Sequence, residues 1–418
     1  MPPAPTEARL RANVPRILWL NASFMFLVVM PIVVPFLRSH GLTLSQVYEL
    51  QAIFAGATLL LELPSGYFAD LIGRRRALVL ACVAKGAAFA VLAVADGFAD
   101  FVVFELVAAV SISLYSGSDI ALIYESYEHV SHEPGEPSRA LGRKLLYSQT
   151  GETVAALLGG ALVLVSLQLP VWVNAIVAWI PLPIALSLVE PPGKRMALRH
   201  GENLRHVGRN LFRRGPFLLL LLANQVVFGA ATLLAVWAYQ PYWGDLGVAL
   251  AWFGLLWALS NGVVAATGGF AHRIEGALGF RGVVVAVAIL TGAGYFGMAQ
   301  AAPGGAVALG VAAGLLLSVS RGLNGVVLRN AMNVRVPGEM RATANSFVSL
   351  GQRLGFALTG PMVGAAMDLN GVAVTFGQLG WAFAFLAVVL GIPLALAAIT
   401  PALPSVAACT ASAEEAAP

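Results

Sequence analysis

Long apolar runs alternate with short polar stretches along almost the whole chain. Twelve of the runs reach about 20 residues, the length that a helix needs to cross roughly 30 Å of hydrocarbon. The pattern therefore predicts an all-α membrane protein with twelve transmembrane helices. The expected spans are 16–37, 46–69, 76–95, 101–125, 143–167, 170–189, 216–239, 248–271, 281–301, 305–328, 342–367 and 374–399. Thr43 and Gln46 have the spacing of a capping box, which predicts a helix start before the second span.

The polar stretch 190–215 divides the spans into two sets of six. The two sets resemble diverged copies, because Gly66-Tyr-Phe-Ala and Arg139-Ala140 both recur 202 residues later, as Gly268-Gly-Phe-Ala and Arg341-Ala342. Such repeats are typical of transporters made of two related bundles. The expected parts are an N-terminal segment 1–15, a six-helix bundle 16–189, a basic linker 190–215, a second bundle 216–399 and an Ala/Pro-rich tail 400–418.

The charges are few and unevenly placed. Only 11% of residues are charged, against about 25% in soluble domains, and the mean hydropathy is +0.80. Of the 25 Lys and Arg residues, 21 lie in loops or ends on the side of the N-terminus, which predicts an even number of spans with both termini in the cytoplasm. The net charge of +4 then reflects topology and contact with anionic lipid rather than nucleic-acid binding.

Several functional classes find no support in the sequence. Two cysteines supply neither a disulfide framework nor a metal site. The chain has no G-x-x-x-x-G-K-[ST] loop for a nucleotide and no nucleophile motif, so we expect no enzyme, no cofactor and no ATP-driven pump. The excess of Arg over Lys is typical of a GC-rich bacterial genome, which predicts a protein of a bacterial cytoplasmic membrane. We expect the protein to be a monomer.

One motif stands between the second and third spans, in the stretch ELPSGYFADLIGRRR at 62–76. It resembles the loop signature G-x-x-x-D-x-x-G-R-R/K of the major facilitator superfamily, which is matched by Gly66, Asp70, Gly73, Arg74 and Arg75. The resemblance implies two six-helix bundles around a central cavity that is lined by helices 1, 4, 7 and 10. It also implies that the bundles rock to expose the cavity to each side in turn.

The same resemblance implies roles for the loop. Asp70 would contact the N-terminal end of helix 11, where free N–H groups favour an anion. Arg74 would pair with an acid at the end of helix 4, either Glu125 or Asp119. Together these contacts would latch the cytoplasmic gate in the outward-open state.

Other stretches resemble a bacterial branch of the superfamily that is assigned to drug export. They are 116–126, 237–242, Arg341-Ala-Thr and Gly360-Pro361 with Gly364. On helix 5, Gly151, Gly159 and Gly160 match the packing motif of proton-coupled exporters, but Ala155 and Ala156 replace its Gly-Pro pair. This difference keeps a proton-coupled uptake symporter open as an alternative.

Charged residues inside the spans are candidates for coupling, because each costs at least ~2.5–3.5 kcal/mol there. They are Glu62, Lys85, Asp119, Glu152, Arg321 and Arg353. Glu62 can pair with Lys85 or Arg353, and Asp119 with Arg321 across the two halves. Glu152 can carry a proton, bind a cationic substrate or serve packing. A further acid, Glu105, is expected near the external surface.

Polar and aromatic residues on the helices expected around the cavity are candidates for substrate contact or helix packing. They are Asn21, Tyr115, Asn224, Gln225, Trp237, Gln240 and Asn324. The sequence thus predicts a secondary transporter that exports a small hydrophobic or amphipathic compound in exchange for protons. An uptake symporter for a nutrient or siderophore is the first alternative, and a receptor or scaffold without transport is the second.

Overall fold

The computed structural model describes residues 7–128, 136–192, 215–336 and 338–397. Residues 1–6 of the expected N-terminal segment, 193–214 of the basic linker and the whole tail 400–418 lie outside the described residues. Every regular element within the described ranges is helical, so the predicted all-α class is confirmed.

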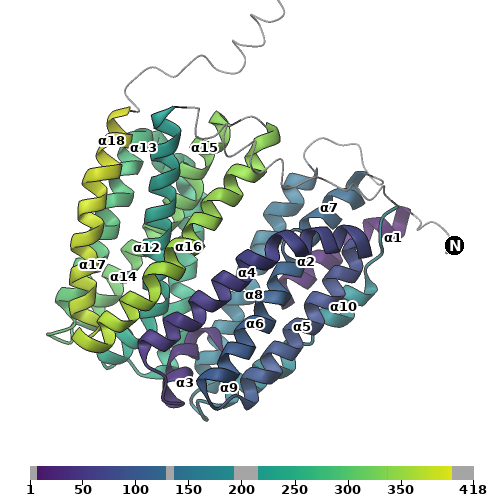
Figure 1. The fold of residues 1–418 in the computed structure, drawn as a ribbon, viewed down its shortest axis with the longest axis horizontal. Coiled ribbons are helices and arrows are strands. Elements are labelled where there is room, and N and C mark those ends of the chain that lie inside the picture. Colours follow the sequence, from purple (N-terminus) through teal and green to yellow (C-terminus); the bar gives the residue numbers. More distant parts are fainter. Residues whose placement is uncertain (1–6, 129–135, 193–214, 337, 398–418) are drawn as a thin grey trace, which may run out of the picture.

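The first half of the chain forms one bundle of helices, drawn in purple and blue in Figure 1. Its elements are α1 (Glu7–Arg11), α2 (Asn13–Phe24), η1 (Met30–Ile32), α3 (Val33–Ser39), α4 (Leu44–Ile72), α5 (Arg74–Val94), α6 (Phe98–Tyr115), α7 (Ser118–Glu128), α8 (Glu136–Leu162), α9 (Leu169–Val177) and α10 (Pro181–Ser187).

The second half forms the other bundle, drawn in teal, green and yellow. Its elements are α12 (Pro216–Asp245), η2 (Leu250–Trp252), α13 (Phe253–Ala301), α14 (Val307–Leu323), η3 (Asn324–Leu328), α15 (Arg329–Arg335), α16 (Gly338–Asn370), α17 (Val372–Leu386), η4 (Ala387–Gly391) and α18 (Ile392–Ala397).

These helices account for all twelve expected spans. Eight helical segments in the described ranges are long and apolar enough to cross a membrane, and one of them, Leu250–Ala301, contains two spans joined at Gly279. The other three are the first span, which is interrupted between Phe24 and Met30, and the more polar helices α8 and α16. The predicted capping box is also present, because Thr43 and Gln46 bond to each other's backbone at the start of α4.

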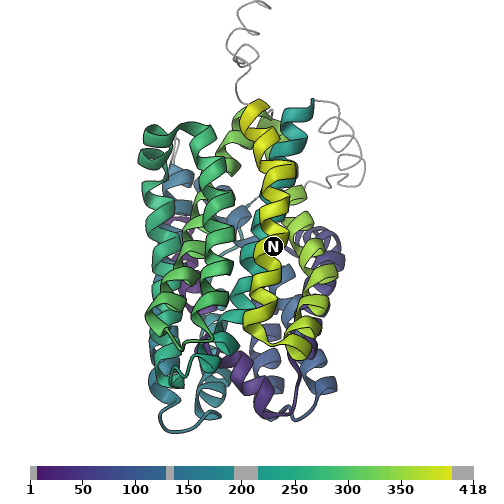
Figure 2. The same ribbon diagram turned by 90° about the vertical axis from the view of Figure 1, so that its left-hand side faces the viewer.

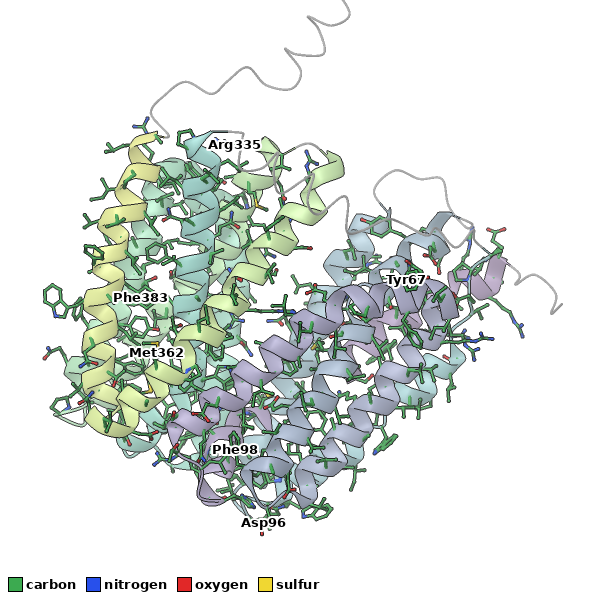
Figure 3. All side chains as sticks on the ribbon, viewed as in Figure 1. Tyr67, Asp96, Phe98, Arg335, Met362 and Phe383 are labelled. Carbon is green, nitrogen blue, oxygen red and sulfur yellow. The ribbon has the colours of Figure 1, made fainter. Side chains whose placement is uncertain are left out.

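The two bundles meet at one end of the molecule and diverge toward the other (Figure 1). In Figure 2 the second bundle faces the viewer, in front of the first. We call the end where they meet, near Val34, Leu44 and Asp368, the closed end. The opposite end, near Ile72 and Arg335, is the open end. Arg335 lies at the open end in Figure 3, and Asp96 and Phe98 lie at the closed end.

Small residues let the bundles touch closely along α8 and α13. A side chain built on Gly254 would collide with the carbonyl oxygen of Ala156 and come within 3.0 Å of the Cα atom of Gly160. On the other side of the molecule, a side chain on Gly364 of α16 would come within 2.7 Å of Ser45 in α4. These contacts bring α8 against α13 and α4 against α16, two of the helix pairs that join the halves.

Candidate functional site

The turn between α4 and α5 lies at the open end and depends on Gly73. This residue has a φ of +100°, which favours glycine. Glu190, which follows α10, accepts the backbone N–H groups of Arg74 at 2.7 Å and Arg75 at 2.8 Å. A carboxylate is favourable there, because the first N–H groups of a helix have no partner within the helix. Arg75 in turn donates to the Leu186 carbonyl oxygen at the end of α10.

The structure brings Arg74 together with two acids of its own bundle. Its guanidinium lies 2.5 Å from Asp70 and 3.3 Å from Glu125 of α7, the first of the two partners expected at the end of the fourth span. Asp70 therefore pairs within the first bundle in this conformation, and the expected contact with the start of α16 is not formed by the described residues. The divergence of the bundles at the open end explains the difference (Figure 1).

Asp119 does not meet Arg321 in this conformation. Its side chain is buried and paired with Lys144 of α8, and Lys144 belongs to the same bundle. Beside this pair, Tyr115 donates to the Asn21 side-chain oxygen at 3.1 Å, and the Asn21 amide donates to the Lys144 carbonyl oxygen at 3.0 Å. Asn21, Tyr115, Asp119 and Lys144 thus form one polar cluster that joins the four helices α2, α6, α7 and α8.

Of the two alternatives for Glu62, the structure forms the pair with Arg353. The Glu62 carboxylate lies 3.4 Å from the Arg353 guanidinium and joins α4 to α16, and both side chains are partly exposed. Lys85 instead donates to the carbonyl oxygens of Ser23 and Phe24, where the first span is interrupted, and its ammonium lies 4.8 Å from the centre of the Phe24 ring. The freed carbonyl groups at the end of α2 give the buried cation its partners.

Glu152 of α8 forms hydrogen bonds with the other bundle. A single carboxylate oxygen accepts the Asn261 amide at 2.8 Å and the Trp257 indole N–H at 3.3 Å, and both donors lie on α13. Both donors are uncharged, so they orient the carboxylate without supplying a countercharge.

The three glycines of the motif expected on helix 5 lie on α8 and pack against two different neighbours. Side chains on Gly151 and Gly159 would collide with the carbonyl oxygens of Ala22 and Val28 in the first span. Gly160 faces Gly254 across the seam between the bundles. Ala156, one of the two replacements in the motif, also lies in this seam.

The polar residues of α12 support backbone groups of their own bundle. Asn224 donates to the Leu390 carbonyl oxygen at 3.0 Å and Gln225 donates to that of Leu328 at 3.1 Å. Both carbonyls belong to π-helical segments, η4 and η3, where the regular bonding of a helix is interrupted. Asn324 donates to the Gln225 carbonyl oxygen at 3.2 Å, and Trp237 packs against the apolar core.

Gln240 and Asp368 form hydrogen bonds between the two bundles at the closed end. The Gln240 amide donates to the Met30 carbonyl oxygen at 2.8 Å and accepts the Val34 N–H at 2.9 Å. The Asp368 carboxylate accepts the N–H groups of Leu44 at 2.9 Å and Ser45 at 2.8 Å. One side chain from each of two helices in the second bundle thus binds backbone of the first.

Comparison with known proteins identifies the chain. Residues 18–360 match the family model described as the Major Facilitator Superfamily. The chain belongs to this superfamily. It is a multi-pass membrane transporter by family and not an enzyme. No curated protein matches the chain in sequence.

Solved structures with the same fold include three superfamily transporters. The nucleoside transporter NupG has a TM-score of 0.73 at 12% identity, with 95% of this chain and 99% of that chain covered. A bacterial homologue of the human lysosomal transporter Spinster, inward-facing and unoccupied, has a TM-score of 0.71 at 16% identity, with 94% and 98% covered. A D-xylose–proton symporter has a TM-score of 0.67 at 14% identity, with 91% and 97% covered.

Several residues of this superfamily member were missed by the sequence interpretation. Glu190, Lys144 and Asp368 all bind groups far away in the chain. Their positions are the one sequence signal that could have marked them as candidates. Glu190 and Asp368 lie at the ends of apolar runs, and Lys144 lies within one. Glu105, expected near the surface, is in fact buried and accepts the Gln51 amide at 2.6 Å, because α6 turns it toward α4.

Proposed function

We propose that the protein exports a small hydrophobic or amphipathic compound in exchange for protons, by alternating access in a bacterial cytoplasmic membrane. The distribution of Lys and Arg supports an orientation with the open end and both termini in the cytoplasm. In that orientation this conformation is inward-facing.

Glu152 is the observation that carries the proposal. Its carboxylate lies within a membrane span and accepts hydrogen bonds from Asn261 and Trp257 of the other bundle, and these two uncharged groups are its partners among the described residues. An ionised Glu152 accepts from both donors, whereas a protonated Glu152 also carries a proton to donate and binds them less strongly. Protonation therefore changes the free energy of one arrangement of the bundles relative to the other, as coupling requires.

Proton flux in proteoliposomes, measured with an internal pH-sensitive dye, tests the proposal. We expect a compound gradient to drive proton movement through the wild type, and Glu152→Gln to abolish this coupling in a protein that is still folded. Glu62→Gln tests the second seam acid in the same way. Glu7→Gln, which alters an exposed acid of α1, is the matched control. Unchanged coupling in Glu152→Gln and Glu62→Gln would contradict the assignment.

An uptake symporter is the second candidate, and the replacement of Gly-Pro by Ala155 and Ala156 favours it. The direction of transport separates the two candidates. In everted membrane vesicles, an exporter accumulates the compound when the interior is acidified, whereas a symporter releases it. A receptor or scaffold would move neither protons nor any compound.

A further inference from the structure

Arg321 is a cation near the middle of a membrane span that has no acidic partner among the described residues. It lies fourteen residues from each end of the span Val307–Arg335, so it is roughly 21 Å from both. Lys144 is paired with Asp119, Arg353 with Glu62, and Lys85 with two carbonyl oxygens. Within the described part of the chain, the Arg321 guanidinium forms no hydrogen bond or ion pair, and its side chain is exposed.

The packing of α14 shows which way Arg321 faces. Gly314, seven residues earlier and therefore on the same side of the helix, lies against Tyr239 of α12. Gly322, the next residue, lies against Thr267 of α13. Ala312 is nine residues from Arg321, which is half a turn around the helix, and is exposed on the opposite face. Arg321 therefore lies between α12 and α13, on the side of the second bundle that faces the first.

The π-helical segment η3 (Asn324–Leu328) brings a second arginine to this face. A π-helical turn contains about one residue more than an α-helical turn. Two residues that are seven positions apart in a regular α-helix lie two turns apart on the same face. Across η3, with its one extra residue, the same relation holds for two residues that are eight positions apart. This relation aligns Arg329 with Arg321, two turns nearer the open end. The buried Arg329 Nε and the Asn324 side-chain oxygen have no hydrogen-bond partner among the described residues.

We propose that Arg321 binds a carboxylate or phosphate group of the transported compound, with Arg329 on the path from the open end. The compound is then an amphipathic organic anion, and this proposal rests on the proposed transport function. An arginine without a countercharge at the middle of a span is costly unless a ligand supplies that charge. The guanidinium can hold either anion with two parallel hydrogen bonds. A lipid headgroup is the other source of such an anion, but headgroups lie at the membrane surfaces, far from this depth.

Binding of four naphthalene compounds that share one apolar body tests the proposal. They are 2-naphthoate, 2-naphthyl phosphate, naphthylmethanol and naphthylmethylammonium, added to purified protein in phosphatidylcholine nanodiscs. We expect the two anions to raise the Tm of the wild type and to lose most of this effect in Arg321→Gln. Arg321→Lys should retain part of the effect because it retains the charge. Arg273→Gln, an exposed arginine outside this face, should respond like the wild type.

The outcomes separate this proposal from the proposed function, because binding does not require proton coupling. Preference for the ammonium compound, an equal anion effect in Arg321→Gln, or no stabilisation by either anion would overturn it. If nanodiscs with phosphatidylglycerol abolish the Arg321-dependent shift, a lipid headgroup occupies the site and the solute proposal fails. If the anions bind through Arg321 but proton flux is absent, the proposed coupling fails alone.

Discussion

Asp368 in α16 accepts a hydrogen bond from the backbone N–H of Ser45 in α4 at 2.8 Å. The second carboxylate oxygen accepts the N–H of Leu44. An acid of the second bundle therefore caps the N-terminus of α4 in the first bundle. Free N–H groups and the helix dipole both favour an anion at this position. This contact and the two bonds of Gln240 stabilise the conformation in which the closed end is shut.

Replacing Asp368 by alanine should open the closed end more often. Loss of a charged cap of this kind costs on the order of 1–2 kcal/mol, which is roughly a tenfold shift in population. A cysteine placed at Val34, with Cys82 and Cys409 replaced by alanine, reports on this opening through its rate of maleimide labelling. Asp96→Ala removes an exposed acid at the same end and should leave the rate unchanged. Equal labelling of both variants would show that Asp368 does not hold this end shut.

Replacing each of two glycines in the 62–76 stretch by alanine should have different effects on the free energy of unfolding. Gly73→Ala meets both a φ of +100° and the Glu190 carboxylate at 2.8 Å, so we expect a loss of about 1–3 kcal/mol in the free energy of unfolding. Gly66 lies inside α4 with no atom within 4 Å of an added methyl group, so Gly66→Ala should be neutral or stabilising by up to ~1 kcal/mol. Thermal unfolding of the purified proteins compares the two. A lower Tm for Gly66→Ala than for Gly73→Ala would contradict the geometry.

The two ion pairs of the membrane region should differ in their contribution to stability. Asp119 is 1% exposed, and Asp119→Asn leaves Lys144 without its countercharge, which costs about 3–5 kcal/mol. The Glu62 side chain is 47% exposed, so Glu62→Gln should cost about 1 kcal/mol or less. Thermal unfolding measures both changes. The double variant Asp119→Asn with Lys144→Gln should recover much of the loss, and no recovery would show that the pair is not the cause.

A side chain at Gly254 should separate the bundles along the seam between α8 and α13. The methyl group of Gly254→Ala would collide with the Ala156 carbonyl oxygen, so α13 must move away from α8. We expect a transport rate reduced severalfold, with faster labelling at the closed end. Gly262→Ala, in the same helix with open space around the methyl group, is the control and should transport normally. Equal rates for both variants would show that close contact here is not required.

The features that could be predicted from the sequence depend on residues close together in the chain. The spans follow from local apolar length, and the Thr43–Gln46 capping box joins residues three positions apart. The pair of Asp70 with Arg74, four positions apart, was not predicted, because Asp70 was expected to contact the start of α16. The signature of the superfamily also pointed to Glu125 as the partner of Arg74.

The contacts between the bundles could not be predicted in the same way. Asp368 is 324 residues from Leu44, Gln240 is 210 from Met30, and Asn261 is 109 from Glu152. A polar residue in a membrane needs a partner, but composition alone does not say which one, because backbone carbonyls and amides compete with side chains of opposite charge. Lys85 illustrates this, since it binds the carbonyl oxygens of Ser23 and Phe24 rather than Glu62.

The interruption of the first span between Phe24 and Met30 has a consequence for the transport cycle. Its backbone is bound by Lys85 and Asn174 from the first bundle, and by Gln240 from the second. When the bundles part at this end, Gln240 leaves with its own bundle, and the Met30 carbonyl and Val34 N–H lose their partners. In the proposed alternating-access cycle, water then hydrates a stretch of main chain that is buried here, so each turnover would include the wetting and drying of the backbone beside Pro31 in η1.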